Sequence, residues 1–431
     1  MYKLIRAPLS LMALTIFIDF VGFGLILPSL PFWAQRFGAG PLGVGLVLTS
    51  YALAQFLFTP LLGSLSDRYG RRPIILAALF IEALSLALSA LATSLPILLA
   101  ARFIGGLGAS NIGSAQAVVA DVTPAEGRAR GMGLIGAAIG LGFVVGPALG
   151  GALAPLGMAA PFWAAMLIAL INALLVLRFL PETRWLEASR ARVSSATPGT
   201  TGATRGDRGA TVMLAGWRTV LHYPIVARLV LVHLLFMGAF SAMEAVFALF
   251  TQRAFGWAAM QNGYSFTYIG VLVVLMQGGL VALFARRWGE QRLLLAGLLL
   301  EALGLASLPW STHWPLLLLT LGIVSVGEGA VTPMISALLS FASPPEARGE
   351  TLGLAQAVAA LARVIGPLAA GGAFAVGGPA APFLVSSALV LLAALIALPA
   401  RTDRQKTRLA DAASAVQSAL AGEATVQARE K

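Results

Sequence analysis

The chain has 431 residues, of which 58% are hydrophobic and only 11% are charged. A soluble domain carries about 25% charged residues. No soluble fold of this size could hide so much apolar surface, so part of the solvent must be lipid. Cysteine is absent, which excludes disulfides and thiol chemistry. The net charge of +11 comes from short clusters between apolar runs, which suits membrane orientation and not a nucleic-acid-binding face.

Twelve apolar runs follow one another along the chain. A helix needs about 20 apolar residues to cross a bilayer, and each run is close to that length. The first run follows Lys3 and Arg6, but it contains Asp19 and lacks a small-residue cleavage site, so we expect an uncleaved span and not a signal peptide. The expected spans cover about 8–33, 44–66, 74–94, 96–120, 131–155, 160–180, 224–250, 262–285, 292–310, 315–340, 350–374 and 379–400.

The charges of the loops between these runs indicate how the chain is oriented across the membrane. On one side of the expected membrane the loops hold only Arg36 and Arg253, whereas the other side holds the remaining basic loops and both termini. Because positively charged loops stay in the cytoplasm, we expect a multi-pass protein of the cell inner (plasma) membrane. An even number of spans then places both termini in the cytoplasm.

The chain also divides into two similar halves. PAEGRARGMG, from Pro124, resembles PPEARGETLG, from Pro344. Two parallel six-span repeats are typical of one large transporter architecture. The stretch between the halves is rich in Gly, Thr and Ser and has no apolar period, which favours a linker. We expect an N-terminal six-helix bundle over 1–180, a cytoplasmic central loop over 181–222, a C-terminal six-helix bundle over 223–400 and a cytoplasmic tail over 401–431.

One short turn concentrates charge between two runs that have almost none. It reads GSLSDRYGRRP, residues 63–73. Its arginines would hold a tight loop inside, but they do not explain Asp67, which can accept hydrogen bonds from a neighbouring helix N-terminus or pair with an arginine. A glycine near a helix end allows close backbone approach, and one in a tight turn allows a positive φ. We therefore expect a cytoplasmic gate formed by Gly63, Asp67, Arg68, Gly70, Arg71 and Arg72.

This turn resembles motif A of the major facilitator superfamily, G-x-L-x-D-R-x-G-R-R-P, without a gap. IGLGFVVGPALGG, residues 139–151, resembles the fifth-helix motif C that is typical of drug/proton antiporters in that family. Glycines on one face allow close helix packing, and a proline weakens the backbone ladder so that the helix can bend. The motif C residues are Gly142, Gly146, Pro147, Gly150 and Gly151.

The first two spans narrow the resemblance to one branch of this superfamily. IDFVGFGLILPSLP, residues 18–31, is similar to the opening of the tetracycline-efflux branch, and YALAQF, residues 51–56, fits the second helix of that branch. One departure is Val273, where the branch has a histidine in its eighth span, and this leaves open whether tetracycline is the substrate. The resemblance implies an all-α membrane protein with twelve transmembrane helices in two pseudo-symmetric six-helix bundles.

Ionisable residues inside the expected spans are candidates for function, because insertion of each charged side chain into the membrane costs about 3 kcal/mol. Asp19 is either a proton- or substrate-binding carboxylate in a central cavity or a helix-packing hydrogen-bond partner. A carboxylate partly removed from water binds a proton more readily. Arg102 matches the motif B arginine that the resemblance links to proton transfer, and the alternative is a structural ion pair. Glu301 resembles the ninth-helix acid of the tetracycline branch. The other candidates are Glu82, Glu244, Glu328 and Arg363.

Neutral polar side chains in the spans are candidates for the substrate cavity. The alternative for each is a hydrogen bond between helices. Together with Asp19, the expected cavity residues are Gln55, Asn111, Gln116, Gln277 and Gln356. The aromatic residues Phe20, Phe23, Trp33 and Phe247 could add apolar contacts.

These features together predict proton-coupled efflux of small amphipathic drugs by alternating access, with tetracycline resistance or multidrug resistance as the outcome. Acidic cavity walls would suit cationic or metal-chelated compounds. The alternative on the same fold is an importer or symporter of a sugar or other metabolite. No P-loop is present, because none of the lysines stands in the required G-x-x-x-x-G-K-[ST] pattern. We expect no enzyme activity, no cofactor and no metal, with the lipid bilayer, protons and a small molecule as partners of a monomer.

Overall fold

The computed structural model describes residues 2–111, 118–119, 128–182, 223–344 and 347–398. Within these ranges the chain is built of helices and contains no strand. The central loop expected over 181–222 lies outside the described residues from residue 183 onward, as does the whole tail expected over 401–431. The domain boundaries therefore stay predictions.

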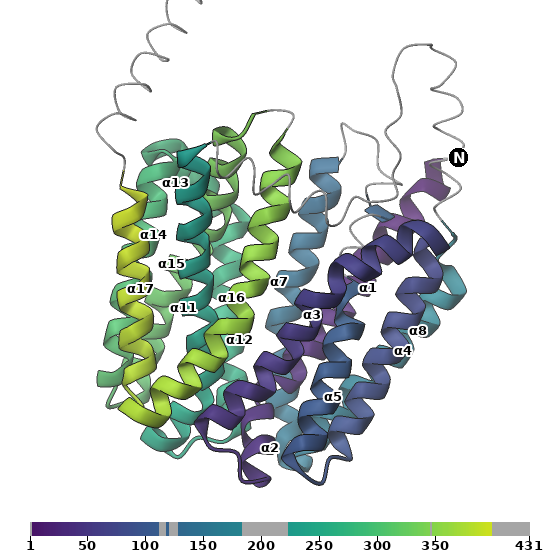
Figure 1. Cartoon of the computed structure of the whole chain (residues 1–431), viewed down its shortest axis with the longest axis horizontal. Helices are drawn as coiled ribbons and strands as arrows, with labels where there is room; N and C mark the ends of the chain where they lie inside the picture. Colours follow the sequence, from purple (N-terminus) through teal and green to yellow (C-terminus); the bar gives the residue numbers. More distant parts are fainter. Residues whose placement is uncertain (1, 112–117, 120–127, 183–222, 345–346, 399–431) are drawn as a thin grey trace, which may run out of the picture.

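Six helices of 14 residues or more lie in the described part of the first half (Figure 1). Proline stands in the first turn of α3, α5 and α8, where its missing N–H costs no hydrogen bond and its fixed φ suits a helix start. The long helices are α1 (Tyr2–Ile26), α3 (Pro41–Tyr69), α4 (Arg71–Ala90), α5 (Leu95–Gly108), α7 (Arg128–Leu153) and α8 (Ala160–Phe179). The short helices are α2 (Leu30–Arg36), η1 (Ala109–Asn111) and η3 (Ala154–Leu156).

The second half has the same order of long helices, and proline again stands in the first turn of α11, α15 and α17. The eighth span of the chain, which is the second of this half, consists of two helices that a π-helical segment joins. The helices are α11 (Pro224–Phe255), α12 (Ala259–Leu275), η5 (Met276–Leu280), α13 (Val281–Trp288), α14 (Glu290–Ser307), η6 (Leu308–Trp310), α15 (Trp314–Ala342), α16 (Arg348–Gly377) and α17 (Ala381–Ala397).

The helices match the twelve expected spans in order. Ten segments, with α12, η5 and α13 counted as one, are long and apolar enough to cross a membrane. The other two, α5 and α17, are shorter apolar helices. The prediction of an all-α membrane protein with twelve spans is confirmed.

The first expected span, 8–33, is wrong at its C-terminal end. Helix α1 ends at Ile26, and α2 begins a separate helix at Leu30. Pro28 lies in the break. A proline lacks the N–H of the helix ladder and disfavours helical backbone in the residue before it, which explains why one apolar run gives two helices.

The two halves meet along two helix pairs, α3 with α16 and α7 with α12. In the first pair a Cβ added to Gly45 would collide with the carbonyl of Pro367, and one added to Gly371 would collide with the carbonyl of Pro41. Thr49 adds a hydrogen bond from its hydroxyl to the Val364 carbonyl at 3.0 Å. These backbones touch directly because the residues at the contact are small.

All of these contacts lie in the N-terminal part of α3 and the C-terminal part of α16. Figure 1 shows these parts together at one end of the bundle, while the C-terminal part of α3 and the N-terminal part of α16 separate toward the other end. The second end carries the charged turn between α3 and α4, and we call it the basic end. Helices α3 and α16 of the two halves therefore touch at the opposite end and diverge toward the basic end.

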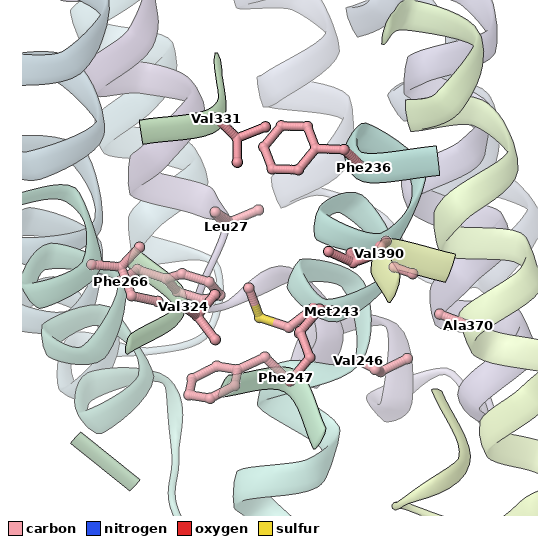
Figure 2. Close-up of a cluster of buried hydrophobic side chains, with 14 of the residues drawn as sticks. Leu27, Phe236, Met243, Val246, Phe247, Phe266, Val324, Val331, Ala370 and Val390 are labelled. Carbon is pink, nitrogen blue, oxygen red and sulfur yellow. The ribbon is translucent and has the colours of Figure 1, made fainter. Parts of the chain in front are cut away.

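The largest buried cluster runs through both halves, and Figure 2 shows a part of it that is built mainly from second-half residues and includes Leu27 of the first half. Helix α11 contributes Phe236, Met243 and Phe247, each fully buried among side chains of neighbouring helices. Because successive residues on an α-helix are about 100° apart, Ala245 lies about 180° and Ser241 about 140° around α11 from Phe236, on the side away from these three core side chains. That side lines the cavity between the halves.

Candidate functional site

A cavity lies between the two halves, with an empty volume of about 930 Å³ that includes its open mouth. Much of its wall is apolar or aromatic, but it brings together ionisable side chains from both halves, separated by more than 340 positions at the extremes. The charged residues that line it are Asp19, Glu82, Arg102, Glu244 and Arg363. Such a cavity between helix bundles, apolar with a few polar groups, is typical of a small-molecule site.

Asp19 is held in place from α8. The side-chain amide of Asn172, which is fully buried, donates to Asp19 Oδ1 at 2.6 Å and to the carbonyl of Thr15 at 3.0 Å. These two bonds fix the direction of the amide and present one carboxylate oxygen of Asp19 to it. Sequence reasoning missed Asn172, although an amide in the middle of the sixth expected span was a visible signal.

Arg102 lies deep in the wall of the first half. Its side chain is 2% exposed, and its guanidinium carbon is 4.4 Å from the centre of the Tyr51 ring. Glu82, 7% exposed, interacts electrostatically with Arg102 and with Asp19. A cation over a ring is stabilised when both are removed from water. The first half therefore places two acids, one arginine and one tyrosine in a single group.

An aromatic surface lies next to this group. Phe143 of α7 is 5.3 Å from Phe20 and 5.9 Å from Phe23, between ring centres, and Phe23 is 5.6 Å from Tyr51. Phe20, Phe23, Tyr51 and Phe143 all line the cavity. This surface can bind the flat apolar part of a molecule. Of the other aromatic candidates, Trp33 and Phe247 are buried in the core.

The second half contributes Ser241 and Glu244 from α11 and Arg363 from α16. Arg363 interacts electrostatically with Glu244 and Tyr51, but it makes no ion pair or hydrogen bond with a residue that the structure describes. The wall of the second half thus carries a guanidinium that is open to the cavity.

Glu301 does not line the cavity. It is fully buried in α14, beside Gly327 of α15, and neither of its carboxylate oxygens has a hydrogen-bond partner among the described residues. Glu328 of α15 interacts electrostatically with Glu301 and with Glu244 of the cavity. Two of the three expected proton-coupling residues, Asp19 and Arg102, therefore lie together, and Glu301 lies apart from them.

The neutral polar candidates are scattered. Gln55 lines the cavity, and its amide donates to the Ala109 carbonyl at 3.2 Å. Gln277 and Gln356 are exposed and are not among the cavity-lining residues. Asn111 belongs to η1, but its side chain is not described, and Gln116 lies outside the described residues.

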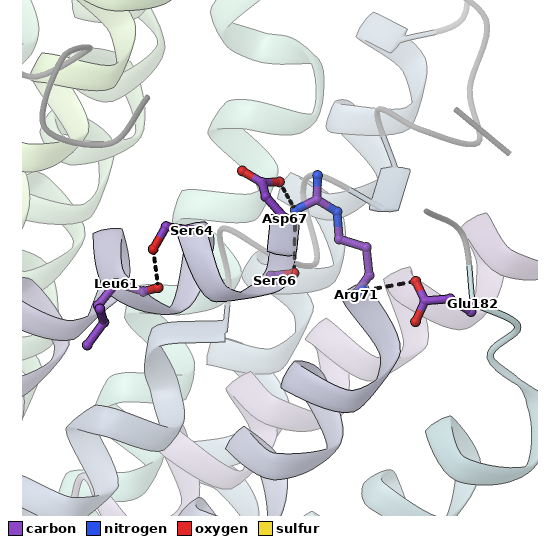
Figure 3. Close-up of polar contacts among 6 residues, drawn as sticks. All are labelled: Leu61, Ser64, Ser66, Asp67, Arg71 and Glu182. Atoms are coloured by element: carbon purple, nitrogen blue, oxygen red, sulfur yellow. Dashed lines mark hydrogen bonds and ion pairs between the residues drawn. The ribbon is translucent and has the colours of Figure 1, made fainter. Parts of the chain in front are cut away.

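The charged turn at the basic end is a hydrogen-bonded unit (Figure 3). Gly70 separates α3 from α4 and has a φ of +111°, which confirms the expected positive φ. Asp67 forms an ion pair with Arg71, four residues on across this break, and Arg71 also donates to the Ser66 hydroxyl at 3.4 Å. Of the two roles expected for Asp67, this structure has the pairing with an arginine.

Glu182, at the end of the first half, completes this unit. Its Oε1 accepts the backbone N–H of Arg71 at 2.9 Å (Figure 3). Its Oε2 accepts the backbone N–H of Arg72 at 3.2 Å. These are the first N–H groups of α4, so Glu182 caps that helix. A Cβ at Gly70 would lie 2.6 Å from Glu182 Oε2, which gives this glycine a second reason besides its φ. Sequence reasoning missed Glu182 because it lies in a different part of the chain.

Close backbone approach was expected both at Gly63 of the charged turn and at the motif C glycines, and only the latter show it. A Cβ at Gly63 would meet no atom within 4 Å, so the close approach expected there is absent from this structure. In α7, by contrast, the motif C glycines touch backbone on two sides. Cβ atoms at Gly146 and Gly150 would collide with α1, and one at Gly151 would lie 2.9 Å from the Met260 carbonyl of α12. The remaining motif C residues are Gly142, against Phe20, and Pro147, against Gly24 and Gly263.

Twelve spans in two halves around a charged cavity define a multi-pass membrane transporter. The chain belongs to the Major Facilitator Superfamily, whose family model matches residues 12–293 and 278–426. The motif A and motif C stretches both lie inside these matches.

Similar proteins include bacterial resistance proteins and a mammalian transporter. The chain is 32% identical to the tetracycline resistance protein of class C from Escherichia coli over 358 residues, which cover 82% of this chain and 86% of that protein. It is 33% identical to the human major facilitator superfamily domain-containing protein 10 over 366 residues, which cover 81% and 76%. The crystal structure of that human protein, described as an organic anion transporter, matches with a TM-score of 0.64 at 29% identity, covering 91% of this chain and 99% of that one.

Proposed function

We propose that this transporter exports small amphipathic drugs, tetracycline-like compounds or a wider range, across the inner membrane in exchange for protons. The observation that carries the proposal is the group of Asp19, Glu82 and Arg102 on one cavity wall beside an aromatic surface. The acids can hold a proton or face a cationic substrate, and the rings can take its apolar part. The tetracycline resistance relatives support the same activity.

The proposal includes an orientation. The basic end carries the arginines of the turn after α3 and Arg286, Arg287 and Arg348, and positively charged loops stay in the cytoplasm. With this end in the cytoplasm, the separated halves form an inward-facing state, and the contacts of α3 with α16 close the outside.

Exchange follows from competition at the acids. In the inward-facing state a drug enters the cavity from the cytoplasm, and its donor or cationic group replaces a proton on an acid. The halves then rock around the cavity so that it faces outward. An outside proton neutralises the acid, releases the drug and favours the return. The net movement of protons down their gradient would supply the free energy for export of the drug over the whole cycle.

Motif A would act as the gate of this cycle. In the inward-facing state Asp67 pairs with Arg71 of its own half. When the cytoplasmic ends close, Asp67 comes close to the N-terminus of α16, whose positive dipole end attracts a carboxylate. The switch between these two partners would lock and release the inner ends of the bundles.

Proton release on drug binding tests the proposal. Purified protein in weakly buffered detergent solution is mixed with tetracycline, ethidium and related drugs, and the pH of the solution is followed. We expect drug-dependent proton release that Asp19→Asn abolishes. Glu290→Gln, which removes an acid at the start of α14 outside the cavity, is the matched control and should release as many protons as the wild type. Absence of release with every compound would overturn drug/proton exchange.

A further inference from the structure

The cavity holds two arginines in different situations. Arg102 is buried and lies over the Tyr51 ring, with Glu82 as its acidic neighbour. Arg363 is exposed to the cavity that it lines, and none of the described side chains or carbonyls forms an ion pair or hydrogen bond with it. A cation within a membrane-spanning bundle is costly unless a partner compensates it. Glu244 compensates Arg363 only through space, without an ion pair, so a hydrogen-bonded partner of Arg363 is to be sought among the molecules that enter the cavity.

The surroundings of Arg363 suit a carboxylate. Its guanidinium offers parallel N–H donors that match the two oxygens of a carboxylate. Ser241, on the side of α11 that faces the cavity, lines the same cavity. Its hydroxyl forms no hydrogen bond with any described residue and can therefore donate to a bound molecule. Glu244 interacts electrostatically with Arg363 but is not within ion-pair distance of it. An acid this close disfavours a second negative charge, so the site fits a single carboxylate.

Across the cavity, the wall of the first half supplies the rest of a binding site. Phe20, Phe23 and Phe143 form the aromatic surface, and Asp19 lies next to it. A flat cationic or donor-bearing ring system can lie on this surface while its carboxylate points at the second half. Such a molecule would touch both bundles, which is what a transporter needs to link binding with their relative movement.

We propose that Arg363 and Ser241 form a subsite for the carboxylate of an amphipathic substrate whose ring system lies against Phe20, Phe23 and Phe143. This inference rests on the proposed export function and names its substrate class: zwitterionic or monoanionic amphipaths, and not simple lipophilic cations.

A matched pair of dyes tests this directly. Rhodamine B carries a free carboxylate, and its methyl ester has the same cationic ring system without the negative charge. Binding of each dye to the purified full-length protein is measured by fluorescence anisotropy. We expect Arg363→Gln to weaken binding of rhodamine B at least about tenfold, because charge-assisted hydrogen bonds are lost. Binding of the ester should change less than about twofold, which also reports that the variant is folded.

Three further variants sharpen the result. Arg363→Lys keeps the charge and should restore part of the preference for the acid, while Ser241→Ala should weaken rhodamine B by a smaller factor. Arg178→Gln, which removes an exposed arginine at the end of α8, should leave both dyes unchanged. Equal losses of acid and ester in Arg363→Gln would overturn the subsite and indicate a structural arginine. So would a wild type that does not bind rhodamine B or does not prefer it to the ester.

This failure would be distinct from failure of the proposed function. Wild-type protein that releases protons with tetracycline or ethidium but treats the two dyes alike would keep drug/proton exchange and lose the carboxylate subsite.

Discussion

Single residues set the chemistry of the cavity, and Asn172 does so without lining it, through its hydrogen bond to Asp19. It is buried in α8 and donates one hydrogen bond to Asp19 and one to the backbone of α1. Its amide stabilises the charged form of the carboxylate and fixes its direction, because a hydrogen bond to a charged group contributes about 1.5–3 kcal/mol. Asn172 is thus a positioning residue for the proposed coupling acid.

Replacement of this amide gives a prediction. In Asn172→Leu the carboxylate of Asp19 loses the donor that fixes its direction. The drug concentration that gives half-maximal proton release should therefore rise by about tenfold, as expected for the loss of about 1.5 kcal/mol from a hydrogen bond to a charged group. The measurement is proton release as a function of drug concentration at one fixed pH.

Asn262→Leu is the control for this change, because Asn262 is an equally buried amide that does not line the cavity. Its oxygen accepts from the Thr251 hydroxyl, and its nitrogen donates to the Ala258 carbonyl. This variant should lower stability and leave the half-maximal drug concentration unchanged. An unchanged half-maximal concentration in Asn172→Leu would show that this amide does not act through Asp19.

At the scale of elements, the start of α4 depends on a residue more than a hundred positions away. The carboxylate of Glu182 accepts two of the helix N–H groups that have no partner within α4. A cap of this kind stabilises a helix by about 1 kcal/mol, and its negative charge at the helix start adds a further 0.3–1 kcal/mol or so. The charged turn is therefore held by the segment that follows α8 as well as by α3.

Glu182→Ala should lower the thermal midpoint of unfolding by a few degrees, as expected for a loss of about 1–2 kcal/mol. Glu182→Gln keeps one acceptor oxygen and should fall between this variant and the wild type. Glu350→Ala, which removes an acid from the first turn of α16 that makes no hydrogen bond with described residues, isolates the dipole effect and should cost less. Tryptophan fluorescence on heating gives the midpoints. Equal midpoints for the Glu182→Ala and Glu350→Ala variants would argue against a hydrogen-bonded cap.

Much of this arrangement could be predicted from the sequence, for a reason that differs from residue to residue. The spans follow from apolar run length, because lipid tolerates no unpaired backbone. Gly70 follows from the turn in which it stands. Asn172 and Glu182 act on residues far along the chain, and no local pattern reports such a contact. Glu301 has the right spacing for its family motif, but spacing does not tell which way a helix faces, and the structure turns it toward α15.

For the whole molecule, the contacts between the halves predict one-sided access to the cavity. The chain has no cysteine, so a single introduced cysteine is the only thiol. Leu48 is half-buried and lines the cavity, so Leu48→Cys should react with a membrane-impermeant maleimide only from the basic end in the state described here. Inside-out and right-side-out vesicles give the two directions of access, and addition of tetracycline should slow the reaction.

Val376→Cys is the counterpart at the other end. Val376 is 93% exposed near the C-terminus of α16 and should react only from the opposite side. Reaction of Leu48→Cys from the same side as Val376→Cys would mean that the closed face and the open face have been assigned the wrong way round.

The π-helical segment of the eighth span has a consequence for how such a molecule moves. Helix α12 packs against α7 of the other half and against α15 of its own half, whereas α13 packs against α14 and α15 of its own half. Between them, Gly279 leaves helical backbone, and Cβ atoms at Gly278 and Gly279 would meet nothing within 4 Å. The first part of the span therefore reaches the other half, and it meets the second part at a break with free space beside it. A break so placed lets the angle between the two halves change while α13 keeps its packing within the second half.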